Sequence, residues 1–139
     1  MLSRENVKII RRAFDVFKRG GIEAAMDYYD EAVVTEESPR WPDRKTYHGH
    51  DGVRQAWEKL CDAFEDPALD AEDFIETDDG RVVVFIRATG RIPDSDARID
   101  ARIAYLYTLH EGKIVRLQVY DDREDALEAA GARRSAGSY

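Results

Sequence analysis

The chain has 139 residues, of which 43% are hydrophobic and 36% charged, and this is the composition of a single globular domain. Its 29 acidic residues outnumber the 21 lysines and arginines, so the formal net charge is −8. Nucleic acids and anionic membranes bind basic surfaces, and the charge therefore argues against both as partners. The sequence shows no signal-peptide core and no run near the roughly 18 apolar residues of a membrane span, so we expect a cytoplasmic protein.

The N-terminal part of the chain is predicted to be helical. Apolar residues recur at helical spacing from Val7 to Phe17 and predict a helix that Gly20-Gly21 stops. A second, short helix is expected over Ile22–Tyr29. A polar loop follows at Ser38–Tyr47, and its part from Pro39 is a candidate lid over a pocket.

A third helix is predicted after this loop. His50 or Asp51 is expected to cap it, and its apolar stripe consists of Val53, Trp57, Leu60 and Phe64. Cys61, the only cysteine, falls within this helix, and we expect it to be a small buried hydrophobic residue.

Strands dominate the rest of the chain. Segments rich in β-branched and aromatic residues predict strands at 32–36, 69–75, 81–90, 97–109 and 113–120. A short helix is expected from Asp121-Asp122 to Ala130, followed by a flexible tail at 132–139. Helices that precede an antiparallel sheet indicate one α+β domain over residues 1–131.

The pairing of the last two strands predicts which side chains share a face. A two-residue turn at Glu111-Gly112 sets Leu106 opposite Leu117 and Ala104 opposite Val119. The same pairing collects on the other face Tyr105, Tyr107, Arg116, Gln118 and Tyr120. Because three N-terminal helices can cover one face only, and because aromatic residues with arginine are typical of interface cores, we expect a homodimer through this second face.

Four segments carry a resemblance to a known family: SRENVKIIRRAFDVFKRGG, DEAVVTEE, YHGHDGVRQAW and LYTLHEGKIVRLQVYDDREDALEAAG. Over residues 3–131 the chain resembles the SnoaL-like branch of the nuclear transport factor 2-like superfamily, which includes ketosteroid isomerase and polyketide cyclases. The resemblance implies a cone-shaped α+β barrel, in which three N-terminal helices pack against a curved, mixed, mainly antiparallel sheet. It also implies a deep pocket between helices and sheet, and usually a dimer through the outer face of the sheet.

The resemblance places a catalytic base on one residue. In ketosteroid isomerase a carboxylate base lies on the strand after the second helix, and this position falls on Glu36. The isomerase tyrosine falls on Ala13 or Phe14, and its protonated aspartic acid falls near Ala104 or Leu106. These apolar side chains cannot donate hydrogen bonds, so the resemblance carries over the base without the oxyanion hole.

Glu36 is accordingly the general base that we expect, on the inward face beside Val34. Arg87 or Arg102 would stabilise developing negative charge in the substrate. The alternative is that these arginines pair with Glu36, or that Arg87 pairs with Asp100 at an exposed end of the sheet.

Other polar residues leave alternatives open. Asp121 is a second candidate acid or the cap of the C-terminal helix. Glu37 is expected to point into solvent. His48 and His50 have no further ligands at suitable spacing, so a turn and a helix cap are favoured over a metal site.

We expect the ligand to be bound by residues of the helices and of the inward sheet face, namely Phe14, Phe17, Val34, His48, Trp57, Phe85, Arg87, Arg102, Ala104, Leu106, Leu117 and Val119. For the aromatic members, a place in the core is the alternative. The predicted function is an apolar pocket for a small organic ligand, in either a cofactor-independent acid/base enzyme (isomerase, cyclase, dehydratase or hydrolase) or a non-catalytic binding or dimerisation module. No cofactor and no metal are predicted.

Overall fold

The computed structural model describes residues 5–131, and the predicted tail at 132–139 lies outside them. The elements in chain order are α1 (Glu5–Ala25), the 3₁₀ turn η1 (Met26–Tyr28), β1 (Tyr29–Glu36), β2 (Thr46–His48), α2 (Gly49–Ala63), β3 (Glu65–Glu76), β4 (Val82–Arg91), β5 (Arg98–His110), β6 (Lys113–Tyr120) and α3 (Arg123–Ala129). Every strand predicted from the sequence is present, and β2 is an additional one.

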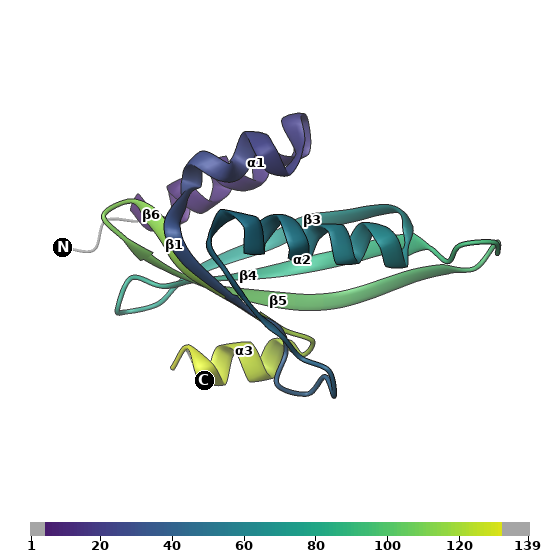
Figure 1. Ribbon diagram of the computed structural model, residues 1–139. Helices are drawn as coiled ribbons and strands as arrows, with labels where there is room; N and C mark the ends of the chain where they lie inside the picture. Colours follow the sequence, from purple (N-terminus) through teal and green to yellow (C-terminus); the bar gives the residue numbers. More distant parts are fainter. Residues whose placement is uncertain (1–4, 132–139) are drawn as a thin grey trace.

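The six strands form one mixed sheet in the order β2-β1-β6-β5-β4-β3. Only β1 and β6 pair in parallel, and the other neighbours are antiparallel. Figure 1 shows α1 and α2 on one face of the curved sheet and α3 on the other. The predicted α+β cone is confirmed, with a sheet that does not close into a barrel.

The first two predicted helices lie within α1, on either side of a break at Gly21. Gly21 has φ 80° and ψ −171°, a backbone conformation outside the helical region, and the helix continues beyond it to Ala25. The predicted break between two helical segments at Gly20-Gly21 is therefore confirmed, and glycine allows it because it adopts positive φ without a steric penalty. The second segment ends at Ala25, followed by the 3₁₀ turn Met26–Tyr28, and does not run as one helix to Tyr29.

α3 covers the face of the sheet opposite α1 and α2, which was expected to lack a helix, and this face carries Ala104 and Leu106 in place of Tyr105 and Tyr107 (Figure 1). Asp122 caps it by accepting a hydrogen bond from the Glu124 backbone amide at 2.7 Å, so the cap is one residue later than Asp121. Ala126 and Leu127 are 0% and 4% exposed. Both pack against buried residues on this face of the sheet, namely Val83, Phe85, Ala104, Leu106 and Tyr120. The sequence-based expectation failed because the amphipathic face of this short helix was not assigned a partner.

The β5–β6 hairpin contains a bulge. Leu109 pairs with Ile114, as a two-residue turn predicts, but Thr108 pairs with Arg116, and this leaves Val115 as an extra residue. Because of this extra residue, each later side chain of β6 shares a face with the other set of β5 side chains than a two-residue turn without a bulge predicts.

Beyond the bulge, Leu117 pairs with Tyr107 and Val119 pairs with Tyr105. The predicted pairing of these two β6 residues with Leu106 and Ala104 is therefore wrong. The residues of β5 that face α1 and α2 are the tyrosines, and not the residues between them.

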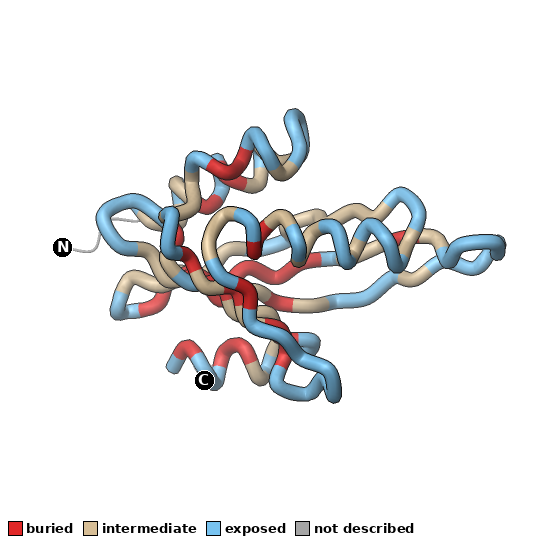
Figure 2. The backbone as a smooth tube through the Cα atoms, viewed as in Figure 1, coloured by how far each residue is buried: buried red, intermediate tan, exposed pale blue. Residues whose placement is uncertain are grey.

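Buried residues concentrate in the middle of the strands, where helices cover both sides (Figure 2). Between α1 and the sheet, Ile10, Val82, Val84, Ile86 and Ile114 are all fully buried. The segment from 92 to 98, at the tip of the β4–β5 hairpin, is exposed throughout.

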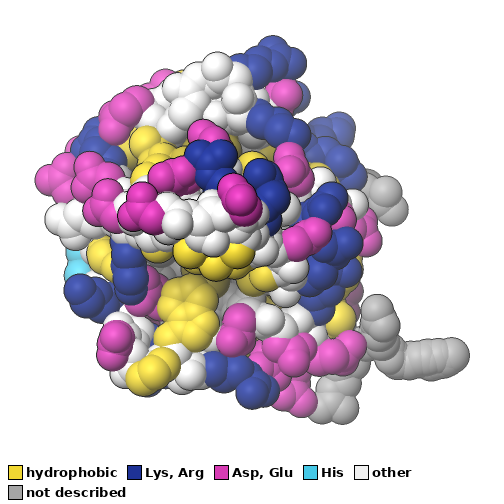
Figure 3. Space-filling model, turned by 90° about the vertical axis from the view of Figure 1, so that its right-hand side faces the viewer, with side chains coloured by type: hydrophobic (Ala, Val, Ile, Leu, Met, Phe, Trp, Pro, Cys, Tyr) yellow, Lys and Arg dark blue, Asp and Glu magenta, His cyan; other side chains and the backbone are white. Residues whose placement is uncertain are grey.

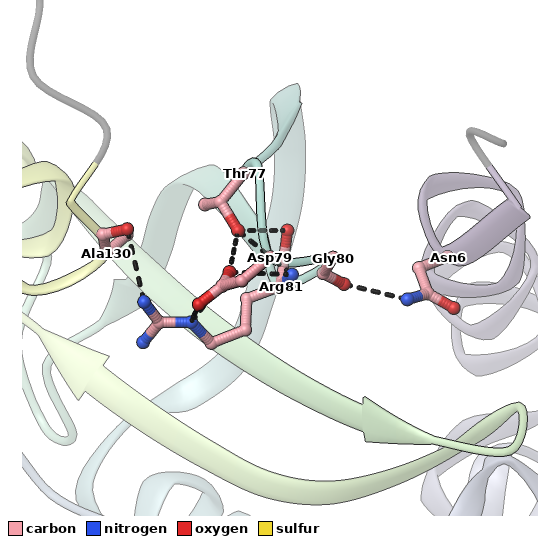
Figure 4. Close-up of polar contacts among 6 residues, drawn as sticks. All are labelled: Asn6, Thr77, Asp79, Gly80, Arg81 and Ala130. Carbon is pink, nitrogen blue, oxygen red and sulfur yellow. Dashed lines mark hydrogen bonds and ion pairs between the residues drawn. The ribbon is translucent and has the colours of Figure 1, made fainter. Parts of the chain in front are cut away.

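The turn between β3 and β4 joins helices from both layers. Figure 4 shows its contacts, which involve Asn6, Thr77, Asp79, Gly80, Arg81 and Ala130. Asn6 at the start of α1 donates from Nδ2 to the Gly80 carbonyl at 2.7 Å. Arg81 donates from Nη2 to the Ala130 carbonyl, just beyond α3, at 3.2 Å.

Asp79 organises this turn. Its carboxylate accepts a short hydrogen bond from the Thr77 hydroxyl and one of 2.9 Å from the Arg81 guanidinium. The hydrogen bond from Thr77, followed by that from Arg81, lowers the pKa of Asp79 from its usual value of 3.8. The folded protein thus favours the ionised form of this side chain.

Candidate functional site

A cavity of about 380 Å³ lies between α1, α2 and the concave face of the sheet. Aromatic and aliphatic side chains make up most of its wall. The aromatic members are Phe14, Phe17, Tyr29, Trp41, Trp57, Phe64, Tyr105 and Tyr107. A cavity of this kind, mostly apolar with few polar groups, is the usual form of a small-molecule site.

The end of β1 supplies the polar part of the wall. Thr35 and Glu37 line the cavity, whereas the intervening Glu36 does not. Alternation along a strand places residues two apart on the same side, so Val33, which is fully buried, shares the face of Thr35. Both alternating sets of β1 carry valine, and the apolar pattern alone therefore could not distinguish the inward set.

Glu37 is a buried carboxylate with four hydrogen bonds. Its residue is 8% exposed. Lys59 of α2 donates from Nζ to both carboxylate oxygens, at 2.9 and 3.1 Å. The Tyr47 hydroxyl and the Lys45 backbone amide donate at 3.2 and 2.9 Å. All four contacts come from donors, which suits a carboxylate.

This cluster connects the loop, β2 and α2. The hydrogen bond with Glu37 raises the pKa of Lys59, so the ammonium form is favoured. Burial, followed by the charge of Glu37, raises the pKa of Tyr47. The Lys59 side chain is 48% exposed, and it reaches inward to Glu37 from the surface.

Three tyrosines form the opposite part of the wall. Burial raises the pKa of Tyr29 to about 12, and a hydrogen bond with Tyr107 opposes this rise in part. Burial also raises the pKa values of Tyr105 and Tyr107. All three side chains are therefore uncharged phenols at neutral pH.

Thr35 contributes an unusual group. The residue is 4% exposed, and its side-chain oxygen has no hydrogen-bond partner in the part of the chain that the structure describes. Buried hydroxyl groups normally have a partner, so such a group next to a cavity indicates a place for a ligand atom.

Trp41 marks the mouth of the cavity. It lines the cavity and is 37% exposed, and it belongs to the loop that was expected to be a lid. Arg40 anchors this loop to Asp125 of α3 at 2.6 Å, and the Ser38 hydroxyl donates to Asp121 at 3.2 Å. Figure 3, viewed from the side of the β4–β5 hairpin, shows hydrophobic side chains between charged ones across the middle of this face.

The predicted ligand-binding residues divide between the two faces of the sheet. Those that line the cavity are Phe14, Phe17, Trp57, Leu117 and Val119. Tyr105 and Tyr107, expected in a dimer interface, also line the cavity, because of the bulge in β6. Sequence reasoning did not place Thr35, Glu37 and Lys59 at the cavity. Only Thr35 left a signal in the sequence, because it lies two residues from Val33 and so shares its face of the strand.

Other predicted ligand-binding residues lie elsewhere. Phe85, Ala104 and Leu106 are buried in the cluster under α3, and Arg123 of α3 lies 4.4 Å from the centre of the Phe85 ring. Val34 alternates with the inward residues of β1, and His48 is exposed just before α2. These five side chains do not line the cavity.

Arg87 and Arg102 belong to an exposed ion-pair ladder and not to the cavity. Arg87 donates two hydrogen bonds to Asp100, at 2.9 and 2.6 Å. Arg102 contacts both Asp100 and Glu72 at 3.2 Å. This is the alternative that the sequence left open, an exposed cross-strand pair of small energetic value.

Glu36, the expected base, is also directed away from the cavity. Its carboxylate forms a bidentate ion pair with Arg116, in which Nε and Nη2 each donate to one carboxylate oxygen at 3.0 Å. Arg116 is on the outer face, as are Gln118 and Tyr120, which are linked to each other by a hydrogen bond of 3.3 Å. Its neighbour Glu37 is the inward carboxylate, which corrects the expectation that Glu37 is solvated.

Further expectations concern single residues. Asp121 neither lines the cavity nor caps α3; it accepts the hydrogen bond from Ser38. Cys61 is exposed and not buried. α2 begins at Gly49 with His48 before it, and neither His50 nor Asp51 is its cap. His50 contacts the Tyr29 carbonyl at 2.8 Å through Nε2.

Within residues 5–131, no three His, Cys, Asp or Glu side chains are grouped so that they could hold a metal ion. Among the helices of the same residues, none is long and apolar enough to cross a membrane.

Several solved structures have a similar fold. TerC, co-crystallised with polyporic acid, has a TM-score of 0.72 and 20% identity, and the match covers 91% of this chain and 97% of that one. A putative SnoaL-like polyketide cyclase from Jannaschia sp. CCS1 has a TM-score of 0.71 and 19% identity, over 93% of each chain. A hypothetical protein of ketosteroid isomerase-like fold from Catenulispora acidiphila DSM 44928, in complex with trimethylamine, has a TM-score of 0.68 and 13% identity, over 90% of this chain and 93% of that one.

At these identities the likeness defines the fold, which is that of the nuclear transport factor 2-like proteins. No curated protein matches the sequence significantly. The sequence profile of the SnoaL-like domain matches residues 10–117. The chain belongs to the SnoaL-like domain family.

Proposed function

We propose that this protein binds a compact, largely apolar organic molecule of two or three rings in the cavity between α1, α2 and the sheet. The observation that carries the proposal is the size and lining of the cavity. An apolar cavity of about 150 Å³ holds one benzene molecule. The volume of about 380 Å³ is roughly 2.5 times as large, which corresponds to two or three rings.

Two related structures support the proposal. TerC was co-crystallised with polyporic acid, and the Catenulispora acidiphila protein is in complex with trimethylamine. Proteins of this fold thus take up small organic molecules. The aromatic walls of the present cavity favour a ring-containing ligand, because ring pairs in edge-to-face contact add to the energy of burial.

Titration calorimetry with naphthalene tests this proposal. Ala56 of α2 lines the cavity, whereas its neighbour Gln55 is exposed. The A56F variant fills part of the cavity and should weaken naphthalene binding at least tenfold, while the control Q55F should bind as the wild type does. Wild-type protein that binds neither naphthalene nor an oxygen-bearing two-ring analogue, or an A56F variant of unchanged affinity, would contradict the proposal.

A second candidate is acid–base catalysis, and one observation favours it: Glu37 is a buried carboxylate in the wall of an apolar cavity. A carboxylate in this position can take a proton from a carbon next to a carbonyl group of the bound ligand. We propose Glu37 for this role in place of Glu36, which is paired with Arg116 on the other side of the strand.

Exchange of carbon-bound hydrogen measures a general base without knowledge of the natural reaction. In deuterium oxide, the protein should speed deuterium uptake next to the carbonyl of 2-tetralone, a two-ring ketone, as followed by NMR. Glu37→Gln should abolish the acceleration, while Glu36→Gln, the matched control one residue away, should retain it. Equal loss in both variants, or no acceleration by the wild type, would leave binding as the function.

A further inference from the structure

The structure assigns a class to the ligand of this cavity: an uncharged molecule whose hydroxyl or carbonyl oxygen hydrogen-bonds to Thr35 or Tyr105. The inference rests on the proposed binding function and goes beyond it, since size and apolarity alone say nothing of the charge or of the polar groups of the ligand.

The first step is the charge of the wall. Among the cavity-lining residues, only Glu37 and Lys59 are charged at neutral pH, and they are paired at 2.9 Å. The tyrosines are uncharged phenols, as shown above. The wall therefore has no net charge and no ion that lacks a partner.

An anionic ligand finds no free cation in this wall. To bind Lys59 it would have to displace Glu37, which would lose two of its four hydrogen bonds while it remains buried. A buried charge without its partner is strongly unfavourable.

A cationic ligand faces a competitor that is part of the protein. It would have to replace the Lys59 ammonium at Glu37, and Lys59 is tethered beside it on α2. A tethered group acts at a high effective concentration, so a free cation of similar charge is at a disadvantage.

The second step is the hydrogen-bonding capacity of the wall. Thr35 has a buried hydroxyl without a partner within residues 5–131, and Tyr105, kept an uncharged phenol by burial, adds a second hydroxyl group to the cavity wall. A rotation about the Cα–Cβ bond of Thr35 exchanges its methyl and hydroxyl groups, so the side chain can present either to the cavity. A hydroxyl group both donates and accepts, and it therefore pairs equally well with a ligand carbonyl or hydroxyl.

The position of these residues indicates two points of recognition. β6 separates Thr35 on β1 from Tyr105 on β5. Thr35 pairs with Leu117, and Leu117 pairs with Tyr107, so Tyr105 lies two strands across and two residues along from Thr35. The two backbones are thus roughly 12 Å apart. The two side chains therefore belong to different strands of the cavity wall, β1 and β5.

Four ligands that share one two-ring frame test the inference by titration calorimetry at about pH 7: naphthalene, 2-naphthol, 2-naphthoate and protonated 2-naphthylmethylamine. A hydrogen bond of ordinary net strength should make 2-naphthol bind roughly 2- to 12-fold more tightly than naphthalene. Both ions should bind at least about tenfold more weakly than naphthalene, because each loses its hydration without gaining a partner.

Variants identify the groups responsible. The double substitution Thr35→Val with Tyr105→Phe should remove the advantage of 2-naphthol while the affinity for naphthalene is kept. The control Thr46→Val changes an exposed threonine of β2 and should leave all affinities unchanged. Naphthalene binding by the double variant shows that it is folded.

The outcomes separate this inference from the proposed function. An ion that binds as tightly as 2-naphthol would overturn the inference and leave the binding function intact. The same holds if 2-naphthol has no advantage over naphthalene, or if its advantage survives the double substitution. If none of the four compounds binds, the proposed function fails and the inference fails with it.

Discussion

Replacing Thr35 by valine should make the free protein more stable. Valine has nearly the same shape as threonine, so the cavity keeps its wall, while the hydroxyl that has no partner is removed. A buried polar group without a hydrogen bond costs about 1–3 kcal/mol. Since valine also prefers strands slightly, we expect the free energy of unfolding to rise by about 1–2 kcal/mol.

Scanning calorimetry without ligand measures this effect. For a domain of this length, 1 kcal/mol corresponds to roughly 3–4 °C in the melting temperature, so Thr35→Val should melt about 3–7 °C higher. The exposed Thr46→Val is the control and should melt within about 2 °C of the wild type, because its hydroxyl is solvated in both states. A Thr35→Val protein that melts at or below the wild-type temperature would refute the assignment of an unpaired hydroxyl. It would also remove one basis for the ligand class inferred above.

Two further predictions concern charged groups. Lys59→Met should lower the free energy of unfolding by about 1–2 kcal/mol in urea titrations, because Glu37 stays buried without its cation. Lys45→Met is the control, because the backbone amide of this residue, and not its side chain, contacts Glu37; an equal loss in both variants would argue against the pair. The pKa of Asp79 is lowered in the folded state, so its contribution to stability is present above its usual value of 3.8 and is lost as pH falls through the lower folded value. Asp79→Asn should therefore show a smaller drop in urea midpoint than the wild type between about pH 5 and about pH 2, and identical drops would contradict this.

The order of elements was predictable because each leaves a local pattern. Strands with β-branched runs, such as 113–120, were located almost to the residue. β2 has only three residues and no such run, so it was not predicted. The break at Gly21 was predicted, since a Gly-Gly pair is a strong local signal for the interruption of a helix.

The site was harder to predict because it depends on which way side chains point. The extra residue Val115 gives no local signal, yet it decides that Tyr105 and Tyr107, and not Ala104 and Leu106, share the cavity face with Leu117. On β1, the choice between Glu36 and Glu37 depends on pairing with strands far along the chain. Helix positions such as Phe17 and Trp57 do line the cavity, because an apolar stripe on a helix has only one direction to face.

The turn at 77–81 has a consequence for the topology of the chain. Asn6, at the start of the first helix, and Ala130, at the end of the last, are both hydrogen-bonded to adjacent residues of this turn. The two ends of the domain are thus bonded to the same turn, each from its own side of the sheet (Figure 4). A circular permutant that joins the ends and opens the chain in the exposed segment near Asp94 preserves every strand pairing of the fold.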